Sequence, residues 1–419
     1  MKYINIFTIF LILMSCKKEV AVVEKIESKQ PVVTTPINIV YSVQSLDSLS
    51  DVNKNSSWYQ TNNSFNELLD ITKTPFNGLN NNSGTFTTYV NNPITVADYW
   101  NDHGIYFYYD FNKDGFKDVW CYNFKSPWPS NQKGLSIFSE YVKNTNSFNV
   151  ELSLTSVRKA VISDLDNDGF KDIVMFSQGY DAPPFPGDSI GIFYPKDNKY
   201  QYLSDDIGFF HGGAVGDIDN DGLSDIVSFG LPNDMNNTPT VYLNKGNRKF
   251  SKSNINYKNF PTNGGGGYPT IELFDVDNNG FLDMVLGQSN EIKIIKNTNG
   301  IFDMNNIIKI QTNGLPLSFI FYDFNKDGKV DILTTNTYDY QGYNLNLYCS
   351  VDNNFKDESS NYFDVISYKS RNTWIKLLRL FDIDRDGDLD VVGDGLFGDL
   401  EKGKIHWKND EGKFKQIIN

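Results

Sequence analysis

The stretch that decides the fold reads Asp164-Leu-Asp-Asn-Asp-Gly-Phe-Lys-Asp172, and variants of it occur at five other places in the 419-residue chain. Aspartates stand at positions 1, 3, 5 and 9 of this loop, and glycine stands at position 6. The other copies begin at Asp110, Asp217, Asp275, Asp323 and Asp382, so the steps between successive copies are 54, 53, 58, 48 and 59 residues. A repeat of about 50 residues falls in the range of propeller blades.

Oxygen donors at alternate positions of a short loop are typical of a calcium site. Calcium takes about six to eight oxygen ligands, and glycine permits the sharp turn that brings positions 1, 3 and 5 together. The backbone carbonyl at position 7 and the carboxylate at position 9 complete the expected cage. The predicted ligands are Asp110, Asn112, Asp114, Phe116 and Asp118; Asp164, Asp166, Asp168, Phe170 and Asp172; Asp217, Asp219, Asp221, Leu223 and Asp225; Asp275, Asp277, Asn279, Phe281 and Asp283; Asp323, Asn325, Asp327, Lys329 and Asp331; and Asp382, Asp384, Asp386, Asp388 and Asp390. Where asparagine replaces aspartate, one carboxylate is lost and weaker calcium binding is expected.

The main alternative for such a loop is the EF-hand, which needs a glutamate at position 12 and a helix on each side. Position 12 is occupied by Cys121, Met175, Ser228, Leu286, Thr334 and Gly393. None of these side chains offers a carboxylate. The flanks are rich in β-branched residues, as in Ala160-Val-Ile162 and Ile173-Val-Met-Phe176, and they predict strands joined by a cation-filled hairpin.

From about residue 105 to the C-terminus, these repeats resemble the FG-GAP or VCBS repeats of integrin α-subunit propellers and of many bacterial surface proteins. The resemblance implies an all-β propeller in which each loop joins the first two strands of a blade. It also implies that positions 1, 3, 5, 7 and 9 hold calcium, about six ions in all. The Phe-Gly and Gly-Ala-Pro elements that give the family its name are mostly absent.

A second recurring motif predicts the outer strand of each blade. It occurs as Asn146-Ser-Phe148, Asn198-Lys-Tyr200, Arg248-Lys-Phe250, Asn299-Gly-Ile-Phe302, Asn353-Asn-Phe355 and Gly412-Lys-Phe414. Asn63-Ser-Phe65 matches as well, so residues 38–100 are expected to form a metal-free seventh blade of a propeller that spans residues 37–419. The alternative is a six-bladed propeller with an N-terminal extension, which a capped helix beginning at Ser64-x-x-Glu67 would favour.

The N-terminus predicts export and a lipid anchor. Lys2 and the apolar run 4–14 form a signal segment that is too short to span a bilayer. Residues 1–16 are therefore expected to be a lipoprotein signal peptide: Leu13-Met-Ser-Cys16 resembles the bacterial lipobox, which implies cleavage before Cys16 and lipidation of this cysteine as the new N-terminus. Lys17-Lys-Glu19 resembles the surface-export signal of Bacteroidetes lipoproteins. An outer-membrane lipoprotein is therefore expected, on the periplasmic or the cell-surface side, with residues 17–36 as a flexible tether.

The formal net charge of −14 argues against a nucleic-acid partner, because a nucleic-acid binder should present a basic face. Six calcium ions would bring the charge close to zero. The acidic excess therefore fits a set of cation sites. Of the three cysteines, Cys121 and Cys349 lie in distant repeats and are expected to be buried free thiols.

Residues just before the inner strands are candidates for binding a ligand, since propellers carry their ligand sites on loops. They are Trp100, His103, Arg158, His211, Tyr268, Trp374 and Lys376. Aromatic and cationic groups of this kind suit a sugar ring and its carboxylates. The sequence favours a binding or adhesion module for glycans or proteins. The alternative is a polysaccharide lyase or hydrolase, but the three histidines lie in different repeats and no motif predicts a catalytic residue.

Overall fold

The structure is a computed structural model. The residues that it describes are 49–63, 105–115, 118–123, 131–142, 145–203, 207–231, 239–253, 270–338, 341–352, 354–371, 374–384, 386–394 and 405–418. All of them belong to one compact unit, residues 41–419. The predicted signal segment, Cys16 and the tether lie outside the described residues. No helix within the described ranges is both long and apolar enough to cross a membrane.

The described residues form six antiparallel sheets, each built from strands that follow one another in the chain. The first three sheets are β1 (Ile105–Tyr109), β2 (Asp118–Asn123), β3 (Leu135–Val142) and β4 (Thr145–Leu152); β5 (Val157–Ser163), β6 (Asp172–Ser177), β7 (Ile190–Tyr194) and β8 (Lys199–Tyr202); and β9 (Phe209–Gly216), β10 (Asp225–Leu231), β11 (Thr240–Asn244) and β12 (Phe250–Ser253).

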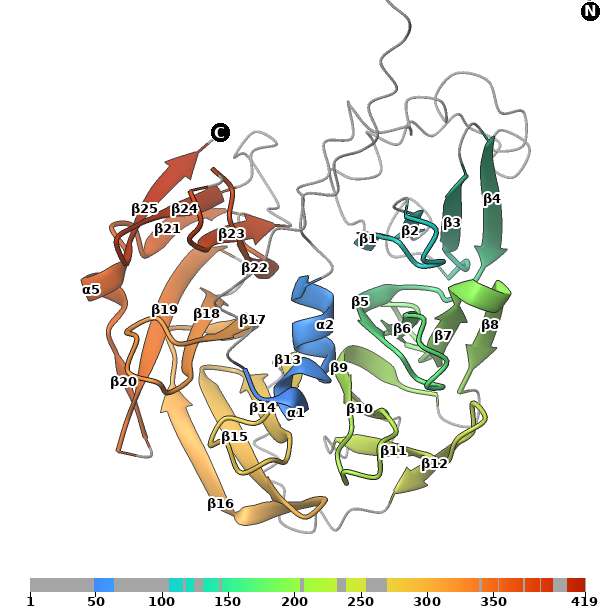
Figure 1. Cartoon of the computed structure of the whole chain (residues 1–419), viewed down its shortest axis with the longest axis horizontal. Helices are drawn as coiled ribbons and strands as arrows, with labels where there is room; N and C mark the ends of the chain where they lie inside the picture. Colours follow the sequence, from blue (N-terminus) through green and yellow to red (C-terminus); the bar gives the residue numbers. More distant parts are fainter. Residues whose placement is uncertain are drawn as a thin grey trace, which may run out of the picture. The chain divides into compact units, whose positions relative to one another are not determined.

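The last three sheets are β13 (Thr270–Phe274), β14 (Asp283–Gln288), β15 (Glu291–Thr298) and β16 (Ile301–Gln311); β17 (Leu315–Tyr322), β18 (Asp331–Tyr338), β19 (Gln341–Val351) and β20 (Asn354–Asp357), with β21 (Ser367–Arg371) added to β19; and β22 (Leu377–Phe381), β23 (Asp390–Asp394), β24 (Ile405–Asp410) and β25 (Lys413–Ile418). A short 3₁₀ turn, η2 (Pro195–Asp197), lies between β7 and β8, and a short helix, α5 (Ser359–Tyr362), lies between β20 and β21 (Figure 1).

The strand order confirms two predictions from the sequence. Each Asp-rich loop joins the first and second strands of its sheet, and its ninth residue is the first residue of the second strand. Each described copy of the second motif leads into or lies in the outermost strand of its sheet, β4, β8, β12, β16, β20 or β25. The expected all-β, propeller-like architecture is therefore present in the described residues.

Successive sheets pack face to face. The first strands β5, β9, β13, β17 and β22 contact one another in that order. The apolar clusters each draw on neighbouring sheets, as where Phe138 of the first sheet meets Phe193 of the second with ring centroids 5.2 Å apart. The second strands β6 and β14 are buried along their whole length because both of their faces are covered. This double burial explains why Ile173–Phe176 is a continuous apolar run and shows no polar alternation.

The second and third sheets approach closely at a glycine of β9, where no side chain lies between them. A Cβ atom built on Gly213 of β9 would lie 2.0 Å from the ring of Phe176 in β6. The second and third sheets can therefore pack at this distance only with glycine at position 213. Cys349, in β19, is a buried free thiol as expected, whereas the side chain of Cys121 lies outside the described part.

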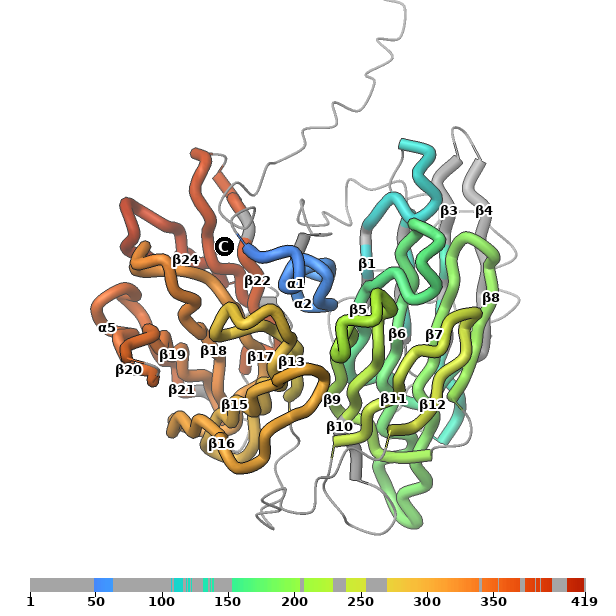
Figure 2. The backbone as a smooth tube through the Cα atoms, turned by 60° about the horizontal axis from the view of Figure 1, so that its bottom comes forward, coloured from blue at the N-terminus to red at the C-terminus, as the bar shows by residue number. Residues whose placement is uncertain are grey.

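Two short helices, α1 (Asp51–Lys54) and α2 (Ser57–Asn63), lie among the first strands of four different sheets. Figures 1 and 2 both place them between β5 and β9 on one side and β13 and β17 on the other. Ser57 Oγ accepts a hydrogen bond from the Val215 N–H (2.9 Å), and Trp58 Nε1 donates to the Phe319 carbonyl (3.0 Å). Trp58 is only 4 % exposed and meets Phe274 and Phe321 edge-on.

These helices bear on the predicted seventh blade. Residues 51–54 and 57–63 are helical, and α2 ends at Asn63, the first residue of the motif Asn63-Ser-Phe65 that is expected to mark an outer strand. The predicted helix at Ser64–Glu67 and the remainder of 64–100 lie outside the described residues. The described part of 38–100, residues 49–63, therefore contains two helices and no strand.

Candidate metal centres

The six Asp-rich loops share one backbone conformation. The carboxylate at position 1 accepts the N–H of the glycine at position 6 in all six loops, for example Gly169 to Asp164 at 2.9 Å. The carboxylate at position 9 accepts the N–H of position 2, for example Leu165 to Asp172 at 2.8 Å. The glycines have φ between 84° and 98°, a region that strongly favours glycine. The turn is therefore closed by hydrogen bonds that depend on the spacing of the aspartates and the glycine in the motif.

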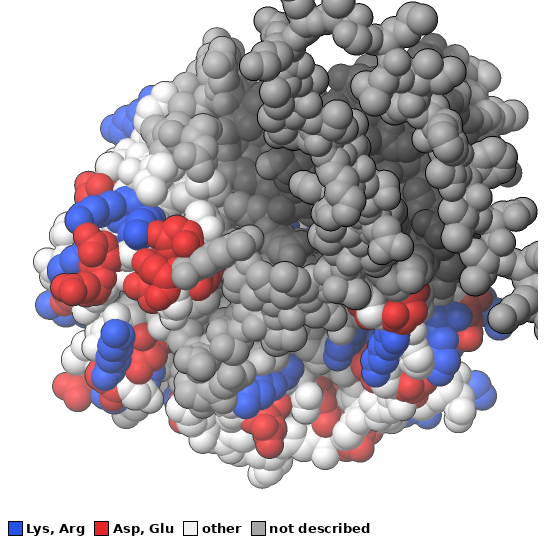
Figure 3. Space-filling view, turned by 45° about the horizontal axis from the view of Figure 1, so that its top comes forward, with Lys and Arg blue, Asp and Glu red and all other residues white. Residues whose placement is uncertain are grey.

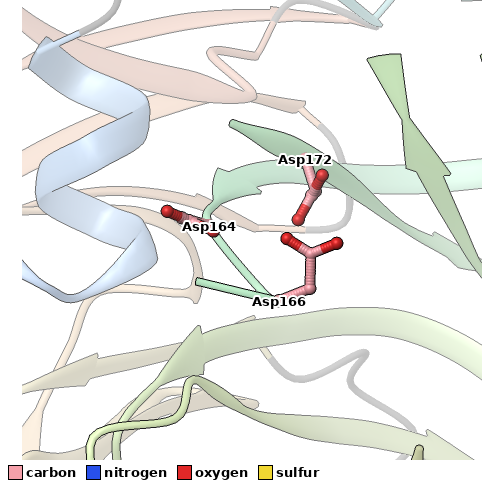
Figure 4. Close-up of side chains that lie close together, drawn as sticks. All are labelled: Asp164, Asp166 and Asp172. Atoms are coloured by element: carbon pink, nitrogen blue, oxygen red, sulfur yellow. The ribbon is translucent and has the colours of Figure 1, made fainter. Parts of the chain in front are cut away.

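This turn brings carboxylates together. In four loops the side chains at positions 1, 3 and 9 each offer an oxygen, and these oxygens lie within 4.8 Å of one another. Figure 4 shows one such trio, in which Asp166 and Asp172 face each other with Asp164 beside them. The four trios are Asp164, Asp166 and Asp172; Asp217, Asp219 and Asp225; Asp275, Asp277 and Asp283; and Asp382, Asp384 and Asp390.

The residue at position 5 also forms hydrogen bonds within the loop. Its side-chain oxygen accepts the N–H of position 7, as between Asp168 and Phe170 at 2.8 Å and between Asp327 and Lys329 at 2.9 Å. It does not belong to the carboxylate trios. In the first and fifth loops position 3 is Asn112 or Asn325, and its amide donates to the aspartate at position 5. Phe116, at position 7 of the first loop, lies outside the described residues.

Burial and crowding make these carboxylates hard to ionise. The pKa of Asp172 is raised to about 8 by burial first and then by the neighbouring loop aspartates, against the hydrogen bond from Leu165. Burial likewise raises the pKa of Asp225 and of Asp283 to about 7 and that of Asp331 to about 6. A divalent cation would remove this penalty, because it favours the charged form of each ligand. The donor set consists entirely of oxygen atoms, which suits calcium.

Basic side chains border several trios. Lys196 pairs with Asp168 (3.0 Å), Lys296 pairs with Asp277 (2.6 Å), and Lys408 pairs with Asp384. Arg248, in the third sheet, reaches Asp166 of the second loop (2.7 Å) and Asp197 of η2 (2.6 Å). Figure 3 shows acidic and basic residues next to one another on the face that it presents. These pairs compensate part of the negative charge, and the Arg248 pairs also join the second and third sheets.

Sequence reasoning missed an asparagine on the third strand. The Asn297 N–H donates to Asp283 (2.8 Å), and its side-chain amide donates to the Ile218 carbonyl of the preceding loop (2.9 Å) and to the Leu282 carbonyl (3.0 Å). Asn244 does the same between the second and third loops. A signal was present in the sequence, since each asparagine stands two or three residues before the glycine of a turn, Gly246 or Gly300, that leads to the outer strand. Neighbouring loops are thus linked by hydrogen bonds as well as by packing.

The candidate ligand-binding residues fall at the opposite end of the first strands. Arg158 is the second residue of β5, His211 is the third of β9, and Lys376 immediately precedes β22. Burial, and after it the charges of Arg158 and Lys376, hold the pKa of His211 well below its usual range. Trp374 is half-buried. Trp100, His103 and Tyr268 lie outside the described residues.

Comparison with known proteins agrees with the repeat. The family described as FG-GAP-like repeat matches residues 217–286 and 275–334, which contain the third, fourth and fifth loops. The chain therefore carries FG-GAP-like repeats at two positions. No curated protein matches the chain.

Two solved structures resemble the chain at low identity. One is an Agrocybe aegerita lectin described as specifically recognising non-reducing terminal N-acetylglucosamine, with 15 % identity and a TM-score of 0.46, covering 77 % of this chain and 82 % of the other. The other is BBS1N in complex with ARL6DN, soaked with lead, with 8 % identity and a TM-score of 0.37, covering 71 % of this chain and 81 % of the other.

Proposed function

We propose that this chain is a lipid-anchored, calcium-braced propeller that acts outside the cytoplasm as a binding module for glycans or proteins. The observation that carries the proposal is the repeated loop, in which carboxylates at positions 1, 3 and 9 converge in at least four described copies. Six loops with the same hydrogen bonds, each between the first two strands of a sheet, are positioned to stabilise the scaffold. The rest of the surface is then available for recognition.

Calcium in these loops has a structural role in the proposal. The oxygens of positions 1, 3 and 9 would hold the ion, with further donors from positions 5 and 7 as the sequence predicts. The ion would neutralise carboxylates whose pKa values are raised because burial disfavours their charged form. Binding energy of this kind adds to the stability of the folded state, because the unfolded chain has no preformed site.

The anchor and the number of blades are further parts of the proposal. The lipobox-like sequence at Cys16 supports attachment to the outer membrane, and the six described sheets with helical residues 51–63 support six blades with an N-terminal extension. A Cys16→Ser variant should lose membrane association in fractionated cells. Unchanged membrane association of that variant would contradict the anchor and leave the propeller untouched.

The binding function is tested with the purified chain in calcium, lacking residues 1–16, on arrays of glycans and of surface proteins. Saturable retention of at least one ligand without chemical change is the expected result. The same incubations are analysed for new reducing ends and for unsaturated ends that absorb in the ultraviolet. Either product would replace the binding module with a polysaccharide-degrading enzyme, and retention of nothing would refute the binding function.

A further inference from the structure

The second, third and fourth Asp-rich loops are joined to one another by hydrogen bonds between exposed residues. The side-chain amide of Asn167, at position 4 of the second loop, donates to the Gly222 carbonyl of the third loop (2.8 Å). Asn220, at position 4 of the third loop, donates in the same way to the Gly280 carbonyl of the fourth loop (2.9 Å). These bonds link residues 55 and 60 positions apart in sequence, so they depend on how the sheets pack.

The places of these bonds within the loops matter for a cation site. Asn167 lies between Asp166 and Asp168, the predicted ligands at positions 3 and 5 of the second loop. The carbonyl that it reaches belongs to Gly222, at position 6, between the predicted ligands at positions 5 and 7 of the third loop. The bond from the third loop to the fourth has the same two ends. Each bond therefore ties the ligand segment of one loop to the ligand segment of the next.

A second set of bonds, formed by buried asparagines, joins the same three loops. The Asn244 amide donates to the Leu165 carbonyl at position 2 of the second loop (2.7 Å), and the Asn244 N–H donates to Asp225 at position 9 of the third loop (2.8 Å). Asn297 repeats this arrangement between the third and fourth loops. Both asparagines are fully buried. Each of these two junctions is therefore held by two separate amides.

The junction between the fourth and fifth loops is built differently. Ser350 of the fifth sheet stands where the third and fourth sheets carry Asn244 and Asn297, and its N–H donates to Asp331 (2.9 Å). Serine keeps this backbone bond but has no amide with which to reach the preceding loop. Position 4 is a lysine in the first and fifth loops. The second, third and fourth loops thus form one hydrogen-bonded unit within the described residues.

A carboxylate of this unit has an acceptor atom that a cation would satisfy. Asp164 accepts the Gly169 N–H through Oδ2 (2.9 Å), whereas its Oδ1 atom is buried and forms no hydrogen bond within the described residues. A buried acceptor of this kind is costly unless it finds a partner. Asp164 is also part of the trio with Asp166 and Asp172. The second loop therefore fits a bound cation on grounds other than its acidic composition.

We propose that the second, third and fourth loops bind calcium cooperatively, as one unit coupled by the side-chain amides of Asn167, Asn220, Asn244 and Asn297. The inference rests on the proposed calcium sites and adds the coupling between them. A loop that is already ordered presents a fixed carbonyl or amide to its neighbour, so the neighbour loses less conformational entropy when it binds an ion. Coupling between sites usually changes affinity by about 5- to 150-fold, and it acts equally in both directions.

The test follows hydrogen exchange by mass spectrometry while the purified chain is titrated with calcium. The N–H groups of Gly169, Gly222, Gly280 and Gly387 each bond to the position 1 carboxylate of their own loop, so peptides that contain them report one loop at a time. Asp219→Ala removes a predicted ligand from the third loop. It should raise the calcium midpoints of the second and fourth loops by about fivefold or more and leave that of the sixth loop unchanged.

Asp384→Ala makes the same change at position 3 of the sixth loop, and as the matched control it should leave the midpoints of the second, third and fourth loops unchanged. Asn220→Gly tests the bond itself, because glycine accepts the positive φ of Asn220 (58°) but has no amide. In this background the effect of Asp219→Ala on the fourth loop should shrink by about twofold or more. Asn278→Gly, at position 4 of the fourth loop with φ 56°, should leave that effect intact.

Equal midpoints of the second and fourth loops with and without Asp219→Ala would overturn the coupling and leave the calcium-braced scaffold in place. An effect that Asn220→Gly and Asn278→Gly reduce alike would overturn the role of the Asn220 amide. If calcium protected none of the four loops at any concentration, the calcium sites on which the inference rests would themselves be refuted.

Discussion

At the scale of single residues, the ninth position of each loop has two functions. One oxygen of Asp172 fixes the turn by accepting the Leu165 N–H, while the same side chain belongs to a carboxylate trio with Asp164 and Asp166. A turn of this kind can be closed by an asparagine as well as by an aspartate, because only an acceptor oxygen is needed. The negative charge is needed only for the cation.

Asp172→Asn separates the two functions. The asparagine of the variant retains an acceptor for the Leu165 N–H but removes a buried charge, so the metal-free protein should unfold at the same or a higher temperature than the parent. In calcium the variant should bind one ion fewer by elemental mass spectrometry. It should also lose up to about 2.7 kcal/mol of calcium-dependent stability at hundredfold saturation.

The control for this substitution is Asp352→Asn, at an exposed turn between β19 and β20 with the same change of charge. It should leave the ion count and the calcium response unchanged. An Asp172→Asn protein that binds as many ions as the parent would show that the trio is not a metal site.

At the scale of elements, α2 is the part of the fold that the sequence did not reveal. Its seven residues are too few to be helical on their own, since isolated helices shorter than about 12–15 residues are marginal in water. It is stabilised instead by distant partners, such as the Phe319 carbonyl that accepts from Trp58 261 residues away. No local pattern encodes such a contact.

Trp58→Ala should therefore destabilise sheets that are far away in the sequence. The substitution removes a buried ring between Phe274 and Phe321 and leaves the Phe319 carbonyl without its indole donor. We expect a loss of about 3–5 kcal/mol, measured by chemical unfolding in calcium. Asn55→Ala, at an exposed position between the two helices, is the control and should change stability by less than about 0.5 kcal/mol. A Trp58 effect as small as that of the control would mean that α2 does not support the sheets.

The loops and outer strands, by contrast, could be predicted. Their signals are local: Gly169 closes a turn on Asp164 five residues earlier, and each outer strand is marked by its own aromatic residue. The carboxylates at positions 1, 3 and 9 lie close together in four loops, and Asp168 at position 5 accepts the Phe170 N–H. The contact of Asn297 with the preceding loop could not be predicted, because it depends on how two sheets pack.

At the scale of the whole molecule, the loops together determine how stability depends on pH. Without metal, the folded-state pKa of Asp172 is about 8 and those of Asp225 and Asp283 are about 7, well above the usual value of 3.8. The metal-free folded state therefore holds more protons than the unfolded state between these values. The stability that these protonated carboxyl groups contribute is fully present below about pH 4 and is lost as pH rises through 7 and 8.

Calcium should reverse this loss, because it takes the place of the protons. The difference in melting temperature between calcium-loaded protein and protein stripped on a chelating resin should widen from about pH 5 to about pH 8. Thermal unfolding followed by circular dichroism in matched ionic strength measures it. A difference that is constant over this range would contradict the assignment of the raised pKa values to the cation sites.

Two hydrogen bonds join Asn53 to Asp275, and they have a mechanical consequence. The Asn53 side-chain amide donates to the Asp275 carbonyl (3.1 Å), and the Asp275 N–H donates to the Asn53 side-chain oxygen (2.7 Å). With the proposed lipid anchor at Cys16, tension would enter the described part of the chain at α1 and α2, ahead of β1. There the load is divided among Asp275, Val215, Phe319 and Ile162, in four sheets. Tension along the chain would then stretch several hydrogen bonds at once and would not peel away a single edge strand.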